Sequence, residues 1–235
     1  MILLLATALA TAAPAAAAPA AACPDLVTSQ AFVCRALEAQ KDGDPTAAAT
    51  AFEQAAQAGS DKDPATARMW AAAGNLWIAA GQPGKAAVAL DRALALPGLE
   101  AEQHGEALLD RARAAEAQND LKTARAKLTE AAASISDDPF YWYFSAAVYV
   151  RELDSAGARM AIGRALSLAP SDPEILFEAG HVMHLAGDDV KAREYWMRAA
   201  GSDANGTAGK AARDALALLP VPITVKLDPD PKAKP

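Results

Sequence analysis

Residues 139–170 read PFYWYFSAAVYVRELDSAGARMAIGRALSLAP, and this stretch carries the pattern that predicts the fold. A small residue, Ala146, is preceded four positions earlier by Trp142 and followed three positions later by Tyr149. A second trio then places small residues around a bulky one: Ala158, Ile162 and Ala165. Small residues let two helices approach closely while bulky ones fill the space beside them. The stretch therefore predicts a helical hairpin.

The second trio occurs five times along the chain. Its copies begin at residues 48, 86, 124, 158 and 192, which are spaced 38, 38, 34 and 34 residues apart. Twelve residues before each copy lies another small residue: Ala36, Gly74, Ala112, Ala146 and Gly180. Five concordant copies predict a row of stacked helical hairpins, one for each repeat.

This arrangement resembles the tetratricopeptide repeat (TPR), a 34-residue helix-turn-helix unit with the pattern W-x2-L-G-x2-Y, then A-x3-F, then proline. WAAAGNLW at residues 70–77 matches its first half, and residues 142–170 match both halves and the proline. The third copy departs most, because its first helix lacks both aromatic residues. The resemblance covers roughly residues 29–204. It implies an all-α, TPR-like α-solenoid of about five repeats with a C-terminal capping helix.

Turn and cap residues divide the chain at the expected places. Four Asp-Pro pairs each combine an N-cap acceptor with a proline suited to the first helical turn: Asp44-Pro45, Asp63-Pro64, Asp138-Pro139 and Asp172-Pro173. Gly81 and Gly187 stand where helices are expected to end.

We therefore expect a repeat unit at residues 23–206. Its five repeats are placed at about 29–62, 63–100, 101–138, 139–172 and 173–206. A capping helix at 207–219, with Thr207 as its N-cap, and a Pro-rich disordered tail at 220–235 follow.

Residues 1–22 form an apolar segment without a charged side chain, MILLLATALATAAPAAAAPAAA. Its apolar core is shorter than the roughly 20 residues of a membrane span, and it leads into an Ala-x-Ala sequence. We therefore expect a bacterial signal peptide at 1–22 and a periplasmic or otherwise exported protein. The alternative is a retained anchor helix.

Cys23 follows directly on the expected cleavage point, and Cys34 lies eleven residues later. In an oxidising compartment the two would form a disulfide. Alternatively, Ala21-Ala22-Cys23 resembles the end of a bacterial lipobox, whose cysteine is lipidated. The protein would then be an outer-membrane lipoprotein acting as a structural subunit of an envelope complex, and only then would the membrane be a partner. A third alternative is two unrelated thiols.

Charge and motifs exclude several functions. The formal net charge is −7, whereas nucleic-acid binders present a basic face, so we expect no nucleic-acid partner. Gly84-Lys85 and Gly209-Lys210 lack the upstream glycine of a phosphate-binding loop. We expect no enzyme activity, no cofactor and no metal. The alternative is a metal-binding protein or enzyme using Glu178, His181 and His184, although residues three apart share a helix face and residues six apart do not.

In the TPR family the first helices of successive hairpins line a concave surface that holds a peptide. The resemblance implies a non-catalytic protein–protein interaction scaffold that binds a partner peptide or subunit in this groove. Its inner wall would consist of Arg68, Asn75, Arg113, Glu116, Phe140, Tyr143, Arg151, Phe177, His181 and His184. Arginines there would pair with a partner's carboxylates, and aromatic side chains would anchor apolar ones. The alternative is a wall that is solvated, or filled by the protein's own tail or a neighbouring copy.

Overall fold

The computed structural model describes residues 23–219, which form eleven α-helices and no β-strand. The predicted signal peptide (1–22) and tail (220–235) lie outside the described residues. The helices are α1 (Ser29–Lys41), α2 (Pro45–Gln57), α3 (Pro64–Ala79), α4 (Pro83–Ala95), α5 (Ala101–Ala117), α6 (Leu121–Ile135), α7 (Pro139–Arg151), α8 (Ser155–Leu168), α9 (Pro173–Leu185), α10 (Asp189–Ser202) and α11 (Thr207–Leu218). Within 23–219, no helix is both long enough and apolar enough to span a membrane.

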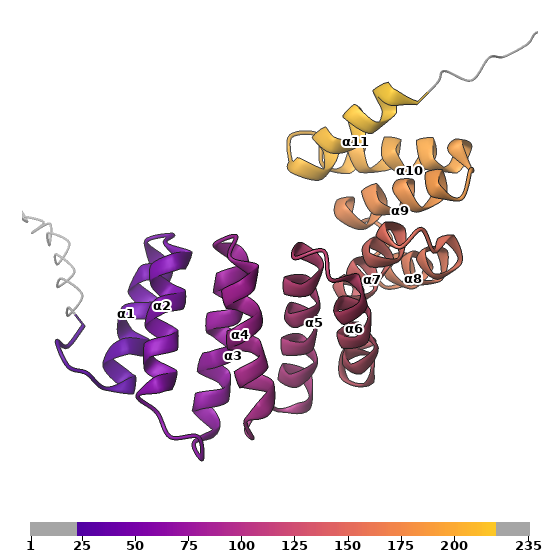
Figure 1. Ribbon diagram of the computed structural model, residues 1–235. Coiled ribbons are helices and arrows are strands. Elements are labelled where there is room, and N and C mark those ends of the chain that lie inside the picture. Colours follow the sequence, from indigo (N-terminus) through magenta and orange to yellow (C-terminus); the bar gives the residue numbers. More distant parts are fainter. Residues whose placement is uncertain (1–22, 220–235) are drawn as a thin grey trace, which may run out of the picture.

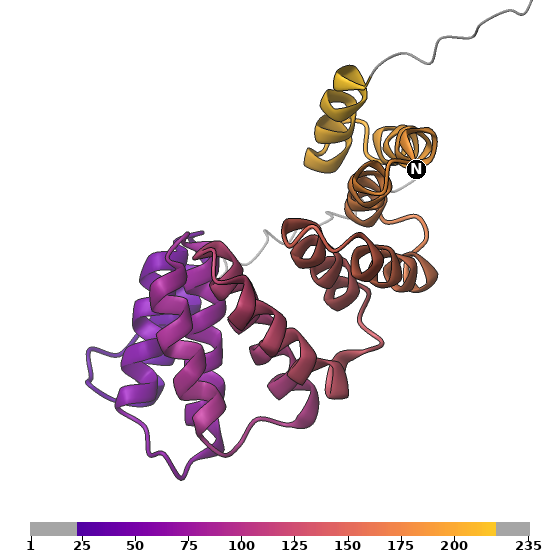
Figure 2. The same ribbon diagram turned by 45° about the vertical axis from the view of Figure 1, so that its right-hand side comes forward.

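Consecutive helices pack as hairpins, from α1 with α2 to α9 with α10, and α11 covers the last one. The first three hairpins stand side by side (Figure 1). Between α6 and α7 the stack changes direction, so that α9 and α10 run across the axes of the earlier helices (Figures 1 and 2). The molecule is an all-α solenoid with a bend after its third hairpin.

The four predicted Asp-Pro caps are confirmed. The Asp44 carboxylate accepts a hydrogen bond from the Ala47 backbone amide at 2.9 Å. Asp63, Asp138 and Asp172 cap α3, α7 and α9 in the same way. The left-handed turns predicted after α3 and α9 are present, because Gly81 and Gly187 have φ values of 67° and 77°.

The small residues of the repeat pattern bring paired helices into close contact. Ala36, Ala112 and Ala146 are completely buried. A Cβ atom on Gly74 would lie 2.4 Å from Leu90 Cγ, so α3 and α4 approach too closely there for any side chain. The bulky member of each trio fills the same layer: Phe52, Leu90, Leu128, Ile162 and Trp196 are all buried.

The 38-residue spacings have a structural cause in the first helices. α3 has 16 residues and α5 has 17, whereas α7 and α9 each have 13. The extra residues therefore add about one turn to the start of α3 and α5, and the small residue keeps its distance from its partner trio.

The predicted N-cap of the last helix is wrong. Thr207 is the first residue of α11, and the capping position is Gly206. Glycine has no side chain that could accept a hydrogen bond from the start of the helix. Asp203 satisfies this helix start instead, since its carboxylate accepts from the backbone amides of Gly206 at 3.0 Å and Gly209 at 3.4 Å.

Candidate peptide-binding groove

A hollow of about 300 Å³ crosses the first helices of the first three hairpins. Small apolar side chains form its floor: Ala71, Ala72, Leu76, Leu99 and Ala107. Polar side chains form its rim: Gln40, Arg68, Asn75, Gln103, Glu106 and Asp110. Because α1, α3 and α5 all contribute, the hollow belongs to the stack of repeats and not to a single hairpin.

A second hollow of about 350 Å³ adjoins the first, since Glu106 lines both. It lies between the start of α5 and the turn from α6 to α7. Its lining is strongly acidic: Glu102, Glu106, Ser134, Ile135, Asp137 and Asp138.

The carboxylates around these hollows influence one another. Partial burial raises the pKa of Glu106 above its ordinary value, and the negative charges of Glu102, Asp110 and Asp138 raise it further. Asp110 is held in place from two helices, because it accepts hydrogen bonds from Asn75 Nδ2 at 2.8 Å and Arg113 Nη1 at 2.7 Å.

Two arginines that we expected to pair with a partner's carboxylates form ion pairs within the protein instead. Arg113 pairs with Asp110 and lies 5.6 Å from the centre of the Phe140 ring. Arg151 donates to the Glu116 backbone carbonyl at 2.9 Å, to the Glu116 carboxylate, and to Asn119 Oδ1 at 2.7 Å. These bonds join α7 to the end of α5.

Aromatic side chains continue the predicted wall along α7 and α9. The ring centroids of Phe140 and Tyr143 lie 5.5 Å apart. The pKa of Tyr143 is raised to about 12, first by burial and then by the nearby carboxylates of Glu178, Glu174 and Asp172.

On α9, His181 sits between two rings, with centroid distances of 4.4 Å to Phe177 and 5.5 Å to Trp196. This half of the wall is an aromatic surface that packs against α10.

Glu178, His181 and His184 do not converge on one point. His181 Nδ1 lies 3.4 Å from Glu178 Oε2, whereas His184 Nδ1 faces Asp189 at 2.6 Å. Among residues 23–219, the group of potential ligand atoms within 4.8 Å of one another consists of Cys23, Cys34 and Glu38. The two sulfurs of that group are bonded to each other. The structure therefore offers no geometric support for the metal alternative at Glu178.

The ten predicted wall residues fall into three groups. Arg68 and Asn75 face the first hollow. Arg113, Glu116, Phe140, Tyr143 and Arg151 lie at the junction of α5 and α7. Phe177, His181 and His184 lie on α9 beside α10.

The sequence prediction missed several residues that line the hollows, notably Gln40, Glu106 and Asp110. A signal for two of them existed. Glu106 lies six residues before Ala112, the same offset that separates Arg68 from Gly74. Gln40 lies four residues after Ala36, the same offset that separates Glu116 from Ala112. Asp110 had no such counterpart on the predicted wall.

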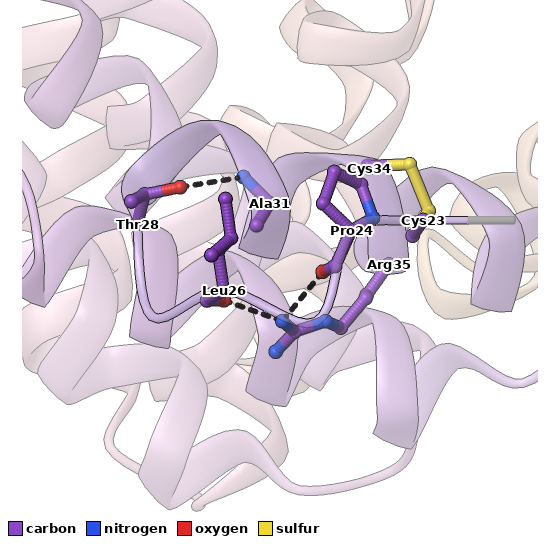
Figure 3. The surroundings of a disulfide bond; sticks show 7 residues. All are labelled: Cys23, Pro24, Leu26, Thr28, Ala31, Cys34 and Arg35. Atoms are coloured by element: carbon purple, nitrogen blue, oxygen red, sulfur yellow. Dashed lines mark hydrogen bonds between the residues drawn. A yellow bond between two sulfur atoms is a disulfide. The ribbon is translucent and has the colours of Figure 1, made fainter.

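The two cysteines fasten the N-terminal arm to α1 (Figure 3). Cys23 and Cys34 are joined by a disulfide with an S–S distance of 1.95 Å. The Arg35 guanidinium adds hydrogen bonds to the backbone carbonyls of Pro24 at 3.0 Å and Leu26 at 2.5 Å. A cysteine held in a disulfide has no thiol left for a lipid, so the disulfide and the lipoprotein alternatives exclude each other.

No protein-family model and no curated protein sequence matches the chain. Solved structures do. PilW, described as a widely conserved type IV pilus biogenesis factor, gives a TM-score of 0.66 at 18% identity, over 79% of this chain and 82% of its own. MamA gives 0.61 at 20% identity, over 82% of this chain and 98% of its own.

YrrB, described as a TPR protein with an unusual peptide-binding site, gives a TM-score of 0.59 at 16% identity, over 79% of this chain and 92% of its own. The repeat pattern, the eleven helices of residues 23–219 and these similarities agree. The chain has a TPR-type fold, an all-α solenoid of stacked helix-turn-helix units.

Proposed function

We propose that the protein is a non-catalytic scaffold that binds a partner peptide or subunit along the first helices of its hairpins. The observation that carries this proposal is the first hollow, which α1, α3 and α5 line together. A surface shared by successive repeats suits an extended segment, because neighbouring repeats offer it contacts from more than one helix. The similarity to YrrB, a protein described with a peptide-binding site, supports this use.

The chemistry of the hollow suggests how a peptide would be held. The floor of alanine and leucine side chains would bury small apolar side chains of the partner. Gln40 and Arg68 are exposed at the rim and would bond to the peptide backbone. Asn75 would accept a hydrogen bond through its Oδ1, since its Nδ2 donates to Asp110. Arg113 and Arg151 contribute by positioning neighbouring groups, since both are paired within the protein.

We further propose that the protein works in the bacterial cell envelope. The predicted signal peptide and a disulfide between Cys23 and Cys34 both suit an oxidising compartment. The similarity to PilW, a pilus biogenesis factor, is consistent with this location. Cell fractionation tests it: we expect the protein in the periplasmic fraction with a mature N-terminus near residue 23, and an unprocessed cytoplasmic product would contradict the proposal.

Site-specific photo-crosslinking in living cells tests the binding surface. A photoreactive amino acid replaces Gln40 or Asn75 on the inner wall, or, as matched controls, the exposed Val88 of α4 or Met160 of α8. We expect a discrete crosslinked partner from the two inner positions and none from the controls. Equal crosslinking from both surfaces, or none from the inner wall, would contradict the groove proposal.

A further inference from the structure

Five carboxylates gather along the two adjoining hollows, and we call them the acidic strip: Glu102, Glu106, Asp110, Asp137 and Asp138. Three lie along α5, and two lie in the turn that leads from α6 into α7. The strip therefore borders the apolar floor of the first hollow and continues through the second.

The acidic strip carries more negative charge than its surroundings neutralise. Asp110 is paired with Arg113. Within residues 23–219, no other member of the strip has a lysine, arginine or histidine nitrogen within 4.0 Å of its carboxylate. The pKa of Glu106 is raised first by partial burial and then by the negative charges of Glu102, Asp110 and Asp138. A positively charged ligand would relieve this repulsion.

The arrangement of the strip distinguishes between a metal ion and a charged chain. A divalent cation needs several oxygens around one point. The strip does not provide this, because the group of ligand atoms within 4.8 Å among the described residues lies at the disulfide instead. Carboxylates spread along a helix suit a ligand whose positive charges are also spread along a line.

The spacing along α5 suggests the form of that ligand. Glu102, Glu106 and Asp110 lie four residues apart, which corresponds to about 6 Å along a helix that rises 1.5 Å per residue. In an extended peptide, side chains on one face recur every second residue, or about 6.6 Å. Alternate residues of an extended segment therefore match successive carboxylates of α5.

We propose that the acidic strip binds an extended partner segment with lysine or arginine at alternate positions and small residues between them. The proposal rests on the proposed function, because it names the chemistry of the peptide that the groove would take. It replaces the expectation that arginines on the wall recognise an acidic partner, since Arg113 and Arg151 are occupied internally.

Fluorescence anisotropy with defined peptides tests the proposal. The probe is an eight-residue peptide of alternating lysine and alanine, and the matched probe alternates glutamate and alanine. We expect the purified full-length mature chain to bind the lysine peptide at least about 10-fold more tightly than the glutamate peptide, with the affinity falling as salt is added.

Two triple variants with the same change in net charge locate the site. Glu102→Gln/Glu106→Gln/Asp137→Asn neutralises three of the five carboxylates of the strip, and we expect it to weaken binding of the lysine peptide about 10-fold, since exposed ion pairs each contribute modestly. Glu130→Gln/Glu194→Gln/Asp214→Asn neutralises three exposed carboxylates that line neither hollow. We expect the control triple to stay within about 2-fold of the unaltered protein.

Three outcomes would overturn the proposal. The glutamate peptide could bind as tightly as the lysine peptide, or both triple variants could lose affinity equally, which would indicate charge attraction without a site. Alternatively, a chain ending at Leu219 could bind the lysine peptide much more tightly than the full chain. The protein's own Lys232-Ala233-Lys234 would then occupy the strip in place of a partner.

Crosslinking separates failure of this inference from failure of the proposed function. If the inner positions Gln40 and Asn75 capture a partner that the strip triple variant still binds equally well, the groove is confirmed and the basic character of the partner is wrong. If they capture nothing in living cells, the proposed function itself fails.

Discussion

Gly180 of α9 lets the ring of Trp196 on α10 approach the backbone of α9 closely. A Cβ atom there would lie 2.2 Å from Trp196 Nε1, and the ring is held because that nitrogen donates to the Phe177 carbonyl at 3.0 Å. We expect Gly180→Ala to lower the free energy of unfolding by about 1–3 kcal/mol, because the ring has to move.

Gly163 supplies the matched control. It lies inside α8, and no atom lies within 4 Å of the position that an alanine methyl group would take, so Gly163→Ala should stabilise the helix by up to about 1 kcal/mol. Urea denaturation followed by circular dichroism measures both variants. Equal effects of the two substitutions would show that helix propensity, and not the approach to Trp196, determines the result.

Tyr143 should make stability depend on alkaline pH. Its pKa is raised to about 12 in the folded protein against an ordinary value of 10.0, so between these values the unfolded chain loses the proton first. The free energy of unfolding should therefore fall as the pH rises through this window, and it should fall less steeply in Tyr143→Phe.

The absorbance of tyrosinate during an alkaline titration measures the ionisation directly. Circular dichroism recorded at the same pH values shows that the protein remains folded. A difference between the unaltered protein and Tyr143→Phe that titrates near 10 would contradict the partial burial of Tyr143.

At the scale of the element, α1 is attached covalently to the N-terminal arm and buries few residues of its own. Its own buried residues are only Ala31 and Ala36, whereas α2 buries six residues. The disulfide closes a short loop, with a sequence separation of 11 between Cys23 and Cys34. Removing such a loop closure costs about 2–3 kcal/mol.

We therefore expect Cys34→Ser to lower the denaturation midpoint and to speed hydrogen exchange in α1 more than in other helices. Reduction of the unaltered protein should reproduce this effect, and reductant should have no effect on Cys23→Ser/Cys34→Ser. The intact mass of the exported protein provides an independent check, because a lipid adduct on Cys23 would rule out the disulfide.

At the scale of the whole molecule, two arginines bridge the bend after the third hairpin. Arg125 of α6 donates to Glu152 at 3.0 Å and lies 3.6 Å from the centre of the Tyr149 ring. Arg151 of α7 reaches back to Glu116. Repeat arrays unfold cooperatively only while neighbouring repeats are coupled, so this junction controls whether the two stacks open together.

We expect Arg125→Ala/Arg151→Ala to let α7–α11 exchange hydrogen independently of α1–α6 and to reduce the slope of the urea transition. Hydrogen exchange read by mass spectrometry resolves the two stacks. Lys127→Ala/Lys191→Ala is the control, because it removes the same charge from pairs that lie within one helix or its cap. A single cooperative opening in the bridge variant would contradict this role.

The hairpins, their order and their caps follow from local pattern, which is why they could be predicted. Spacing of small and bulky residues defines which helix faces pack, and an Asp-Pro pair defines a helix start within a few residues. The prediction failed at Thr207, where the bonds come from Asp203 across a turn. A residue type at a helix start favours a cap, but it does not reveal which neighbouring residue accepts the hydrogen bonds.

The charges of the groove, in contrast, could not be predicted from local pattern alone. Repeat register placed Arg68 and Asn75 on its rim. Arg113 pairs with Asp110 one turn away on the same helix, whereas the pairing of Arg151 with Glu116 depends on how two folded helices lie beside one another. An ion pair between residues about 35 positions apart, such as Arg151 with Glu116, has no signature in composition or periodicity. Periodicity along one chain specifies the helices and their faces, while the charge that a folded surface offers to a partner is set by contacts between side chains in the assembled stack.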